Sequence, residues 1–262
     1  MRLNSATEKS NTATQLLAGR NAVVTGASGG IGRAIALRLI AEGARVTAVG
    51  RNKERLESLL SAASAGSDPA AAGGDAAIML RQVDLTDDKS RSALVAELSD
   101  GARVDLLVHS AGAHSRGAHN DALIQSLDDL YGSNVRAPYA LIQELLPMLR
   151  AGGGDIVVVN STQGVRAAGD VGQYAATQHA MRAITDSLRQ EVNKDGVRVC
   201  SIHLGRAATP MQQAILREEG RPYMPELLLQ PADVATVVVT VAGLPAAAEV
   251  TEIHLRPAKK SY

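Results

Sequence analysis

The 262-residue sequence contains no phenylalanine and no tryptophan, and only five tyrosines. A chain with so few aromatic rings lacks the stacking platforms on which single-stranded nucleic acids are bound. Net charge is also absent, because 27 Lys and Arg balance 27 Asp and Glu, so no global field attracts nucleic acid or an anionic membrane. We therefore expect small molecules or proteins as partners, and a core built from Ala, Val, Leu and Ile.

Cysteine and long apolar runs are equally scarce. The one cysteine, Cys200, lies in an apolar run and cannot form a disulfide within the chain, which suits a reducing compartment. The first twenty residues are polar and lack the apolar core of a secretion signal. The longest apolar stretch, residues 234–250, is interrupted by threonine, glycine and proline and falls short of a clean membrane span. These features predict a soluble, cytoplasmic protein whose residues 1–18 form a flexible tail.

Short β-branched apolar runs alternate with segments of helical period along most of the chain. This alternation indicates a mostly parallel sheet with helices on both faces. The predicted fold class is α/β, as a single doubly wound domain over residues 19–262. The strand candidates are 21–26, 44–50, 76–83, 103–110, 155–161, 197–204 and 249–255, and helical periods are clear at 32–43 and 182–196.

Two segments break the alternation. Residues 61–74 are rich in alanine, serine and glycine, and we interpret them as a surface loop because the alternation resumes directly after them. Residues 205–230 contain prolines and two glycines and precede a further helix and strand. This second segment is the candidate for a mobile substrate lid.

A glycine-rich segment, "VVTGASGGIGRAIAL" at 23–37, follows the first predicted strand and opens the first predicted helix. Gly26, Gly30 and Gly32 would let the backbone turn tightly and approach a pyrophosphate. The N–H groups and the dipole of the helix N-terminus would meet the charge of that pyrophosphate. Placed between strand and helix, the segment is good evidence for a dinucleotide site.

The glycine spacing, Gly-x-x-x-Gly-x-Gly with Thr25 in front, resembles the short-chain dehydrogenase/reductase family, and the resemblance runs from about Gly19 to the C-terminus. It implies a Rossmann-type fold. Further family motifs follow in family order: "VDL" at 83–85, "AG" at 111–112, Asn134 in a helix, Ser161 after the fifth strand, Tyr174 thirteen residues later and "GRAATPM" at 205–211. The resemblance implies cofactor contacts from Gly26, Ser28, Gly30, Ile31, Gly32, Asp84, Leu85, Ala111, Gly112, Tyr174, Gln178, Gly205 and Thr209.

The end of the second strand bears on the choice of nucleotide. An NAD-selecting site usually has a carboxylate there for the adenosine ribose, whereas this chain has Gly50 followed by Arg51. A guanidinium can clamp a 2′-phosphate through two hydrogen bonds, which favours NADP(H). Two simpler interpretations stay open. Arg51 and Lys53 can be a solvated helix start, and Asp84, which the resemblance places at the adenine edge, can equally be an N-terminal helix cap.

The resemblance also implies a catalytic set. Family members use a serine that holds the substrate oxygen, a tyrosine that passes the proton, a lysine that binds the nicotinamide ribose, and an asparagine that supports a water relay. By position this chain supplies Ser161, Tyr174 and Asn134, but Gln178 stands where the lysine is expected. In isolation, Tyr174 would be interpreted as a tyrosine packed at a helix start.

Gln178 lies one helical turn after Tyr174 and therefore on the same face. Its amide can donate to a ribose hydroxyl but supplies no charge. A cation about 4–5 Å from the phenol, at an effective dielectric near 20, is worth roughly 3–4 kcal/mol, or some two to three pK units. Without it, the pKa of Tyr174 should be about 10 or above. The glutamine thus weakens alcohol oxidation, which needs phenolate, more than carbonyl reduction.

Two smaller departures from the family pattern lie nearby. His109 begins "HSAG" where the family often has two asparagines, and we expect it to take over a hydrogen bond that braces the sheet. Leu204 stands where a proline commonly precedes the glycine, which predicts a less rigid loop on the nicotinamide side.

The six histidines raise the question of a metal site, above all the close pair His114 and His119. Five positions is one too many for two ligands on one helical face, and no acidic or cysteine ligand completes a pattern, so we predict no metal. We expect the loop that carries the pair to wall the substrate pocket. His114, Gln163 and Met211 are the predicted substrate contacts.

These features together predict an NADPH-dependent reductase of a carbonyl or imine group in a small organic substrate. One alternative is a non-redox enzyme in which Ser161 and Tyr174 act as an acid pair for dehydration, isomerisation or cyclisation. Another is a catalytically silent nucleotide-binding protein. The resemblance implies a homodimer or homotetramer assembled through the helices that carry Asn134 and Tyr174.

Overall fold

The computed structural model describes residues 15–66, 77–100 and 103–259, and its centre is one parallel seven-stranded sheet. The strand order is β3-β2-β1-β4-β5-β6-β7. The strands are β1 (Asn21–Thr25), β2 (Arg45–Gly50), β3 (Ile78–Gln82), β4 (Leu106–His109), β5 (Asp155–Ser161), β6 (Arg198–Leu204) and β7 (Glu252–Leu255). The predicted doubly wound α/β fold is confirmed.

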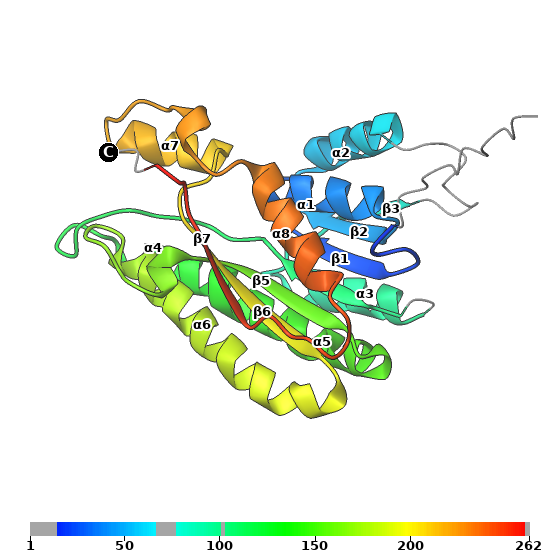
Figure 1. Ribbon diagram of the computed structural model, residues 1–262. Coiled ribbons are helices and arrows are strands. Elements are labelled where there is room, and N and C mark those ends of the chain that lie inside the picture. Colours follow the sequence, from blue (N-terminus) through cyan, green and yellow to red (C-terminus); the bar gives the residue numbers. More distant parts are fainter. Residues whose placement is uncertain (1–14, 67–76, 101–102, 260–262) are drawn as a thin grey trace, which may run out of the picture.

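Helices cover both faces of the sheet, with α1, α2 and α8 on one face and α3, α5 and α6 on the other (Figure 1). The helices are α1 (Gly30–Ala41), α2 (Lys53–Gly66), α3 (Asp88–Ser99), α4 (Ile124–Tyr131), α5 (Ala137–Gly152), α6 (Gly172–Val192), α7 (Pro210–Glu218) and α8 (Pro231–Ala242). Short turns are the π-helical η1 (Gly132–Arg136) and the 3₁₀ turns η2 (Thr162–Gly164), η3 (Asn193–Asp195) and η4 (Pro225–Leu227).

Each face of the sheet has its own aliphatic core. On one face, Ile35 and Leu39 lie four residues apart on α1 and join a buried cluster with Val238 of α8. On the other, Leu141 and Leu145 of α5 have the same spacing and are fully buried. Because both faces are covered, the central strands are continuous apolar runs rather than alternating ones.

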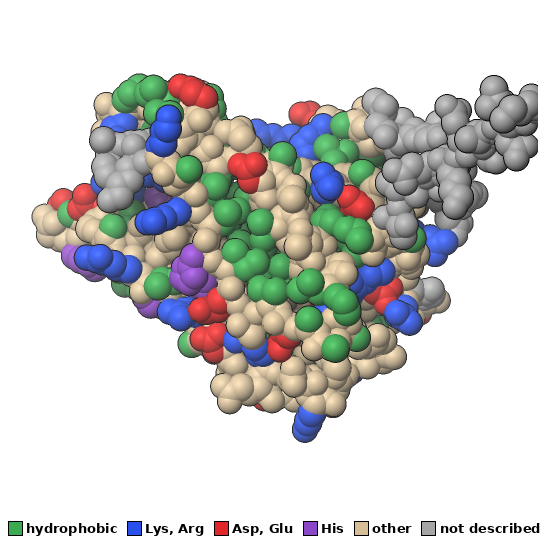
Figure 2. Space-filling view, viewed as in Figure 1, with side chains coloured by type: hydrophobic (Ala, Val, Ile, Leu, Met, Phe, Trp, Pro, Cys, Tyr) green, Lys and Arg blue, Asp and Glu red, His purple; other side chains and the backbone are tan. Residues whose placement is uncertain are grey.

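The surface agrees with the balanced composition. On the face shown in Figure 2, basic and acidic side chains are interspersed, and neither sign forms a continuous patch. Among the helices of the described residues, none combines the length and the apolar character needed to cross a membrane.

The sheet reverses its order between β1 and β4, which are neighbours. At such a switch point, the loops that leave the two strands diverge and open a crevice at the carboxyl edge of the sheet. Since all strands are parallel, the segments that follow β1, β4, β5 and β6 meet at this same edge, and α7 lies beyond it (Figure 1). The fold therefore brings the predicted site segments together.

Two boundaries differ from those expected. Helix α2 continues to Gly66, so the first part of the predicted loop 61–74 is helical, because its alanines are strong helix formers; residues 67–74 lie outside the described part. Leu17 is buried, and its N–H donates to the Glu42 carbonyl at 3.0 Å. The packed structure thus begins before Gly19, while residues 1–14 of the predicted tail lie outside the described part.

An ion-pair network closes the amino edge of the sheet. Asp155 at the start of β5 is buried and accepts from Arg198 Nε at 2.6 Å and Arg20 Nη2 at 2.7 Å. Arg20 also donates to the carbonyls of Asp105 and Ala242. The carboxylate of Asp155 and its two arginines therefore connect β5 and β6 to the end of α8 and to the segment that precedes β1.

Asp155→Asn should lower the free energy of unfolding by about 3 kcal/mol, because two partly buried arginines then lose their anionic partner. Urea unfolding followed by circular dichroism measures this. The matched control is Glu57→Gln, which removes the exposed ion pair with Lys53 and should change the free energy by no more than about 0.5 kcal/mol. Equal losses in the two variants would contradict the role given to Asp155.

Candidate active site

A cavity of about 830 Å³ opens at the carboxyl edge of the sheet. Its volume lies within the range of about 300–1,000 Å³ that is usual for small-molecule sites. Every residue predicted for catalysis, cofactor binding or substrate binding lines this one cavity, although the role of each stays a prediction. They are Gly26, Ser28, Gly30, Ile31, Gly32, Arg51, Asp84, Leu85, Ala111, Gly112, His114, Asn134, Ser161, Gln163, Tyr174, Gln178, Gly205, Thr209 and Met211.

The glycine turn after β1 is packed too tightly for side chains. Gly26 has φ of +69°, and a Cβ there would lie 2.8 Å from the Ala111 nitrogen. A Cβ on Gly32 would lie 2.4 Å from the Gly26 carbonyl oxygen. The turn therefore lies directly against the loop that follows β4, and both glycines are required for this close approach.

The N-terminus of α1 suits an anion. Its N-cap is Gly29, which offers no side-chain cap, and the first turn carries no acidic residue. The first N–H groups of a helix have no partner within the helix, and together with the helix dipole they attract phosphate. The turn and the helix start therefore fit the pyrophosphate of a dinucleotide.

Basic side chains gather at the adjoining end of the cavity. Arg51 lines it together with Arg33 and Arg55, which the sequence analysis did not single out. Arg33 is held by Ser58, to whose hydroxyl and carbonyl it donates at 3.1 Å. The position of Arg33 in the sequence could have identified it, because it directly follows Gly32, the last glycine of the turn. This end of the cavity fits an additional phosphate on a nucleotide ribose.

Asp84 forms a local turn rather than a helix cap. Its carboxylate accepts from the Thr86 hydroxyl at 2.7 Å and the Thr86 N–H at 3.0 Å, and these two hydrogen bonds lower the pKa of Asp84. Asp87 caps α3 instead, accepting from the Ser90 N–H at 3.0 Å. The alternative that Asp84 caps the helix is therefore wrong, and its carboxylate remains at the cavity wall.

Ser161 and Tyr174 meet deep in the cavity. Ser161 ends β5, and Tyr174 lies in the first turn of α6. Both side chains line the cavity, and Ser161 Oγ accepts from the Gln163 N–H at 3.1 Å. Burial raises the pKa of Tyr174, and the nearby Ser161 hydroxyl offsets part of that rise. The phenol therefore carries its proton at neutral pH.

The nearest ring to Tyr174 is that of His114, with ring centroids 4.7 Å apart and planes tilted by 56°. Burial lowers the pKa of His114, although Glu218 raises it in part. Its imidazole is therefore neutral around pH 7 and forms an uncharged wall beside the phenol. It does not replace the cation that a lysine would bring.

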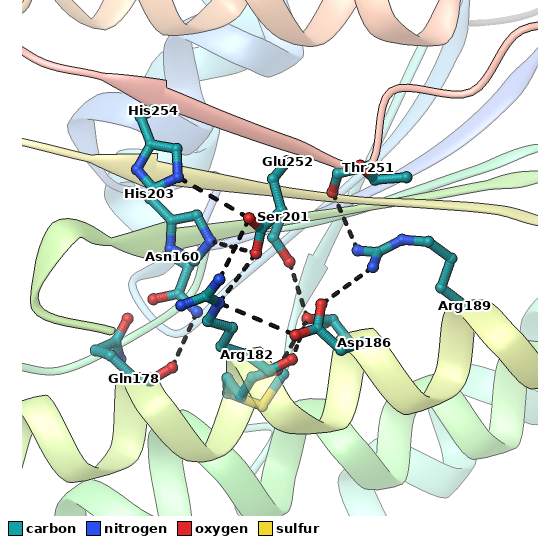
Figure 3. Close-up of polar contacts among 12 residues, drawn as sticks. Asn160, Gln178, Arg182, Asp186, Arg189, Ser201, His203, Thr251, Glu252 and His254 are labelled. Atoms are coloured by element: carbon teal, nitrogen blue, oxygen red, sulfur yellow. Dashed lines mark hydrogen bonds and ion pairs between the residues drawn. The ribbon is translucent and has the colours of Figure 1, made fainter. Parts of the chain in front are cut away.

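Gln178 lies in the cavity wall with little exposure, one turn along α6 from Tyr174. Its Nε2 is 3.5 Å from the Thr177 hydroxyl, at the outer limit of a hydrogen bond, and its backbone carbonyl accepts from Asn160 Nδ2 (Figure 3). The backbone of Gln178 is thus firmly held, while its amide head makes only a weak bond within the described residues. That amide can turn to a bound molecule at small cost.

Asn134 lies in the π-helical turn η1 between α4 and α5. Its side chain accepts from the Ala113 N–H at 2.7 Å and donates to the Ala113 carbonyl at 2.9 Å. It also donates to the Thr177 hydroxyl, which in turn donates to the Tyr174 carbonyl. Asn134 thereby links the loop after β4 to the first turn of α6, and such π turns are frequent at functional sites.

His109 braces the sheet, as expected from the sequence. Its Nδ1 is 3.0 Å from the Thr25 hydroxyl, which accepts from the N–H groups of Ser110 and Ala111 at 3.1 Å. The hydroxyl proton therefore points to His109 Nδ1, and the imidazole proton is on Nε2. Burial lowers the pKa of His109 to about 4, so this bridge is uncharged at neutral pH.

The outer wall of the cavity carries Arg116, which the sequence analysis missed, and Arg206, which lies in the predicted lid segment 205–230. Glu219, just after α7, accepts from Arg116 at 2.7 Å and Arg206 at 2.8 Å. The hydrogen bond from Arg206 lowers the pKa of Glu219, with the positive charges of Arg206 and Arg116 adding to the effect. Arg206 Nη1 is buried and has no hydrogen-bond partner in the described part of the chain.

The fold and this cavity match a known family. The family model described as short chain dehydrogenase matches residues 20–220. The chain therefore belongs to the short-chain dehydrogenase family, a family of oxidoreductases.

Individual relatives agree with this assignment. An uncharacterized oxidoreductase of Staphylococcus epidermidis is 31% identical over 237 residues, which cover 90% of this chain and 96% of the relative. An uncharacterized NAD-dependent oxidoreductase of Mycobacterium tuberculosis is 31% identical over 248 residues, which cover 87% and 90%.

Solved structures agree as well. A variant of the actinorhodin polyketide ketoreductase with NADPH superposes with a TM-score of 0.79 at 26% identity, covering 90% of this chain and 95% of the other. A short chain dehydrogenase of Shigella flexneri complexed with NADP gives a TM-score of 0.81 at 26% identity, covering 92% and 98%. The relatives thus include both NADP-bound and NAD-dependent proteins.

Gln178→Lys should lower the pKa of Tyr174 by about two units, because an ammonium one helical turn away favours the phenolate. The pH dependence of phenolate absorbance measures this, with the Tyr174→Phe background subtracted. Gln178→Met is the matched control, since it keeps the side-chain length and adds no charge. An unmoved Tyr174 titration in the lysine variant would show that residue 178 is not coupled to the phenol.

Proposed function

We propose that the protein is an NADPH-dependent reductase of a carbonyl or imine group in a small organic substrate. The observation that carries this proposal is that the hydroxyls of Ser161 and Tyr174 share one cavity, where burial raises the pKa of the phenol. This pair lies in the same cavity as the glycine turn and the N-terminus of α1. A proton donor and an anion site suited to a dinucleotide therefore share one chamber.

The proposed chemistry divides between the two hydroxyls. The substrate oxygen or nitrogen accepts hydrogen bonds from Ser161 and Tyr174, which orient it and draw electron density from the carbon. A bound reduced nicotinamide nucleotide supplies the hydride to that carbon. Tyr174 passes its proton to the substrate heteroatom as negative charge develops there, and Ser161 holds the same atom throughout.

The proposed direction is reduction. A general acid must carry its proton at the start of the reaction, and a phenol with a raised pKa does so at pH 7. Alcohol oxidation would need the phenolate, which is scarce when no cation stabilises it. Gln178 is proposed to donate from its amide to a ribose hydroxyl, directly or through a water.

The proposed substrate chamber lies between the loop after β4 and residues 205–230, which we propose as a lid. His114, Gln163 and Met211 are its proposed contacts. Arg206 adds a buried guanidinium nitrogen without a partner in the described part of the chain, which supports a substrate with a hydrogen-bond acceptor. We further propose that residues 19–262, together with the residues packed just before them, act as one domain and assemble as a dimer or tetramer.

A second candidate is a non-redox enzyme that uses Ser161 and Tyr174 as an acid pair, with bound nucleotide as scaffold. The neutral amide at position 178 favours it, because proton transfer without phenolate suits dehydration or isomerisation. Mixing the protein with NADPH and a panel of ketones, aldehydes and imines separates the two. Loss of reduced-nicotinamide absorbance supports the reductase, whereas nucleotide binding without turnover over the whole panel contradicts it.

Arg51→Ala should weaken NADP(H) binding by about 1.5–3 kcal/mol, the scale of a lost charge-assisted hydrogen bond, and should barely alter NAD(H) binding. Fluorescence titration of both nucleotides measures this. Lys53→Ala is the matched control, because Lys53 is an exposed cation two residues after Arg51, at the start of α2, and does not line the cavity. If the unmodified protein binds both nucleotides equally, the basis for naming NADP(H) is lost.

Tyr174→Phe should reduce turnover by about two to four orders of magnitude while nucleotide affinity stays nearly constant, since only the acidic proton is removed. Steady-state kinetics and nucleotide titration together measure this. Tyr131→Phe makes the same chemical change at an exposed site outside the cavity and should leave both quantities unchanged. Retained turnover in Tyr174→Phe would mean that the proton comes from another group.

A further inference from the structure

Three potential metal ligands converge at the edge of the sheet, away from the glycine turn. In the parallel pair of β6 and β7, His203 is opposite His254, and Ser201 is opposite Glu252. Residues two apart on a strand face the same side, so Glu252 and His254 lie on the side of His203. One ligand atom from each of the three lies within 4.8 Å of the others (Figure 3).

The spacing of these atoms is close to that of a coordination sphere. His203 Nε2 is 3.4 Å from Glu252 Oε1, and His254 Nε2 is 3.9 Å from Glu252 Oε2. An ion with bonds of about 2.0–2.2 Å in tetrahedral geometry holds its ligands roughly 3.3–3.6 Å apart. The first distance already fits, and a rotation of the half-exposed His254 side chain would bring in the third ligand.

His203 provides the strongest indication. Its side chain is fully buried, with Nδ1 3.3 Å from the Ser161 carbonyl oxygen. Nε2 is near Glu252, yet it makes no aligned hydrogen bond to any residue that the structure describes. A neutral imidazole has one N–H, so one of its nitrogens must face an acceptor oxygen with a lone pair. A cation between Nε2 and the carboxylate removes this conflict.

The contact with Ser161 matches the usual support of a metal-bound histidine. Such a histidine donates its other N–H to a carbonyl or carboxylate, which fixes the ring and presents the free nitrogen to the metal. The ring of His254 stacks on that of His203, with ring centroids 5.0 Å apart, so it has to turn out of this stack to direct its nitrogen at the same ion.

Arg182 of α6 would compete with a metal ion for the carboxylate of Glu252. It donates to Oε1 at 3.0 Å and Oε2 at 3.4 Å (Figure 3). Asp186 lies 3.9 Å from the same guanidinium and can retain it when the carboxylate turns toward an ion. Access is open on the side of His254, whose side chain is about half exposed.

We propose that His203, Glu252 and His254 bind one divalent transition-metal ion, such as Zn²⁺, between β6 and β7. Two imidazoles and a carboxylate suit Zn²⁺, Co²⁺ or Ni²⁺, whereas Mg²⁺ and Ca²⁺ prefer oxygen ligands throughout. The bound ion fastens the edge strand β7 to β6. Because His203 Nδ1 contacts the Ser161 carbonyl oxygen, the ion also helps to hold the backbone of Ser161 in place. The sequence analysis predicted no metal, because it considered only histidines that are close in sequence.

The test uses the full chain after treatment with a chelator. Titration with Co²⁺ should produce visible absorption that saturates at one equivalent, and Zn²⁺ should raise the unfolding temperature in a concentration-dependent way. His254→Gln should abolish both effects, and its exposed position makes it compatible with folding. His179→Gln, which removes an exposed histidine of α6, should retain both. Absence of saturable absorption in the unmodified chain, or its persistence in His254→Gln, would overturn the proposal.

A second variant tests whether Glu252 binds the metal while all three proposed ligands stay in place. Arg182→Met frees both carboxylate oxygens and removes a nearby positive charge, so Zn²⁺ affinity should rise about tenfold or more. Competition with a zinc-sensitive dye measures the dissociation constant in both proteins. An affinity that is unchanged or reduced in Arg182→Met would exclude Glu252 from the site.

Discussion

The hydroxyl of Thr25 holds the carboxyl ends of β1 and β4 together, and the cavity depends on this contact. It accepts from the N–H groups of Ser110 and Ala111 and faces His109 Nδ1. With the two strands joined here, the loop after β4 passes so close to Gly26 that no side chain fits between them. The remaining segments of the site, from β5, α6 and the loop after β6, close around this fixed point.

Burial rather than charge sets the state of Tyr174. Burial raises the pKa of this phenol, so it keeps its proton at neutral pH, and the nearby Ser161 hydroxyl offsets only part of that rise. Neighbouring groups add no compensating cation, because His114 is neutral and Gln178 offers only an amide. This combination accounts for the proposed preference for reduction, since proton donation is ready at neutral pH and proton abstraction is not.

The sequence predicted what depends on local pattern and known motif spacing. Strand and helix alternation led to the fold, and the motif positions led to residues that share one cavity. Features that depend on contacts between residues far apart in the chain were not predicted. Arg116 reaches the cavity wall only through its ion pair with Glu219, and His203 meets His254 only through the register of β6 and β7. The helical conformation at the start of residues 61–74 was not predicted either, because the small residues there were interpreted as a loop.

The most direct test of the central claim is a crystal structure of the protein with NADPH bound. The account predicts the pyrophosphate at the N-terminus of α1, the ribose phosphate beside Arg51, and the nicotinamide facing the Ser161 and Tyr174 hydroxyls, with the Gln178 amide on its ribose. A nucleotide bound outside this cavity, or one whose nicotinamide is directed away from Tyr174, would contradict it.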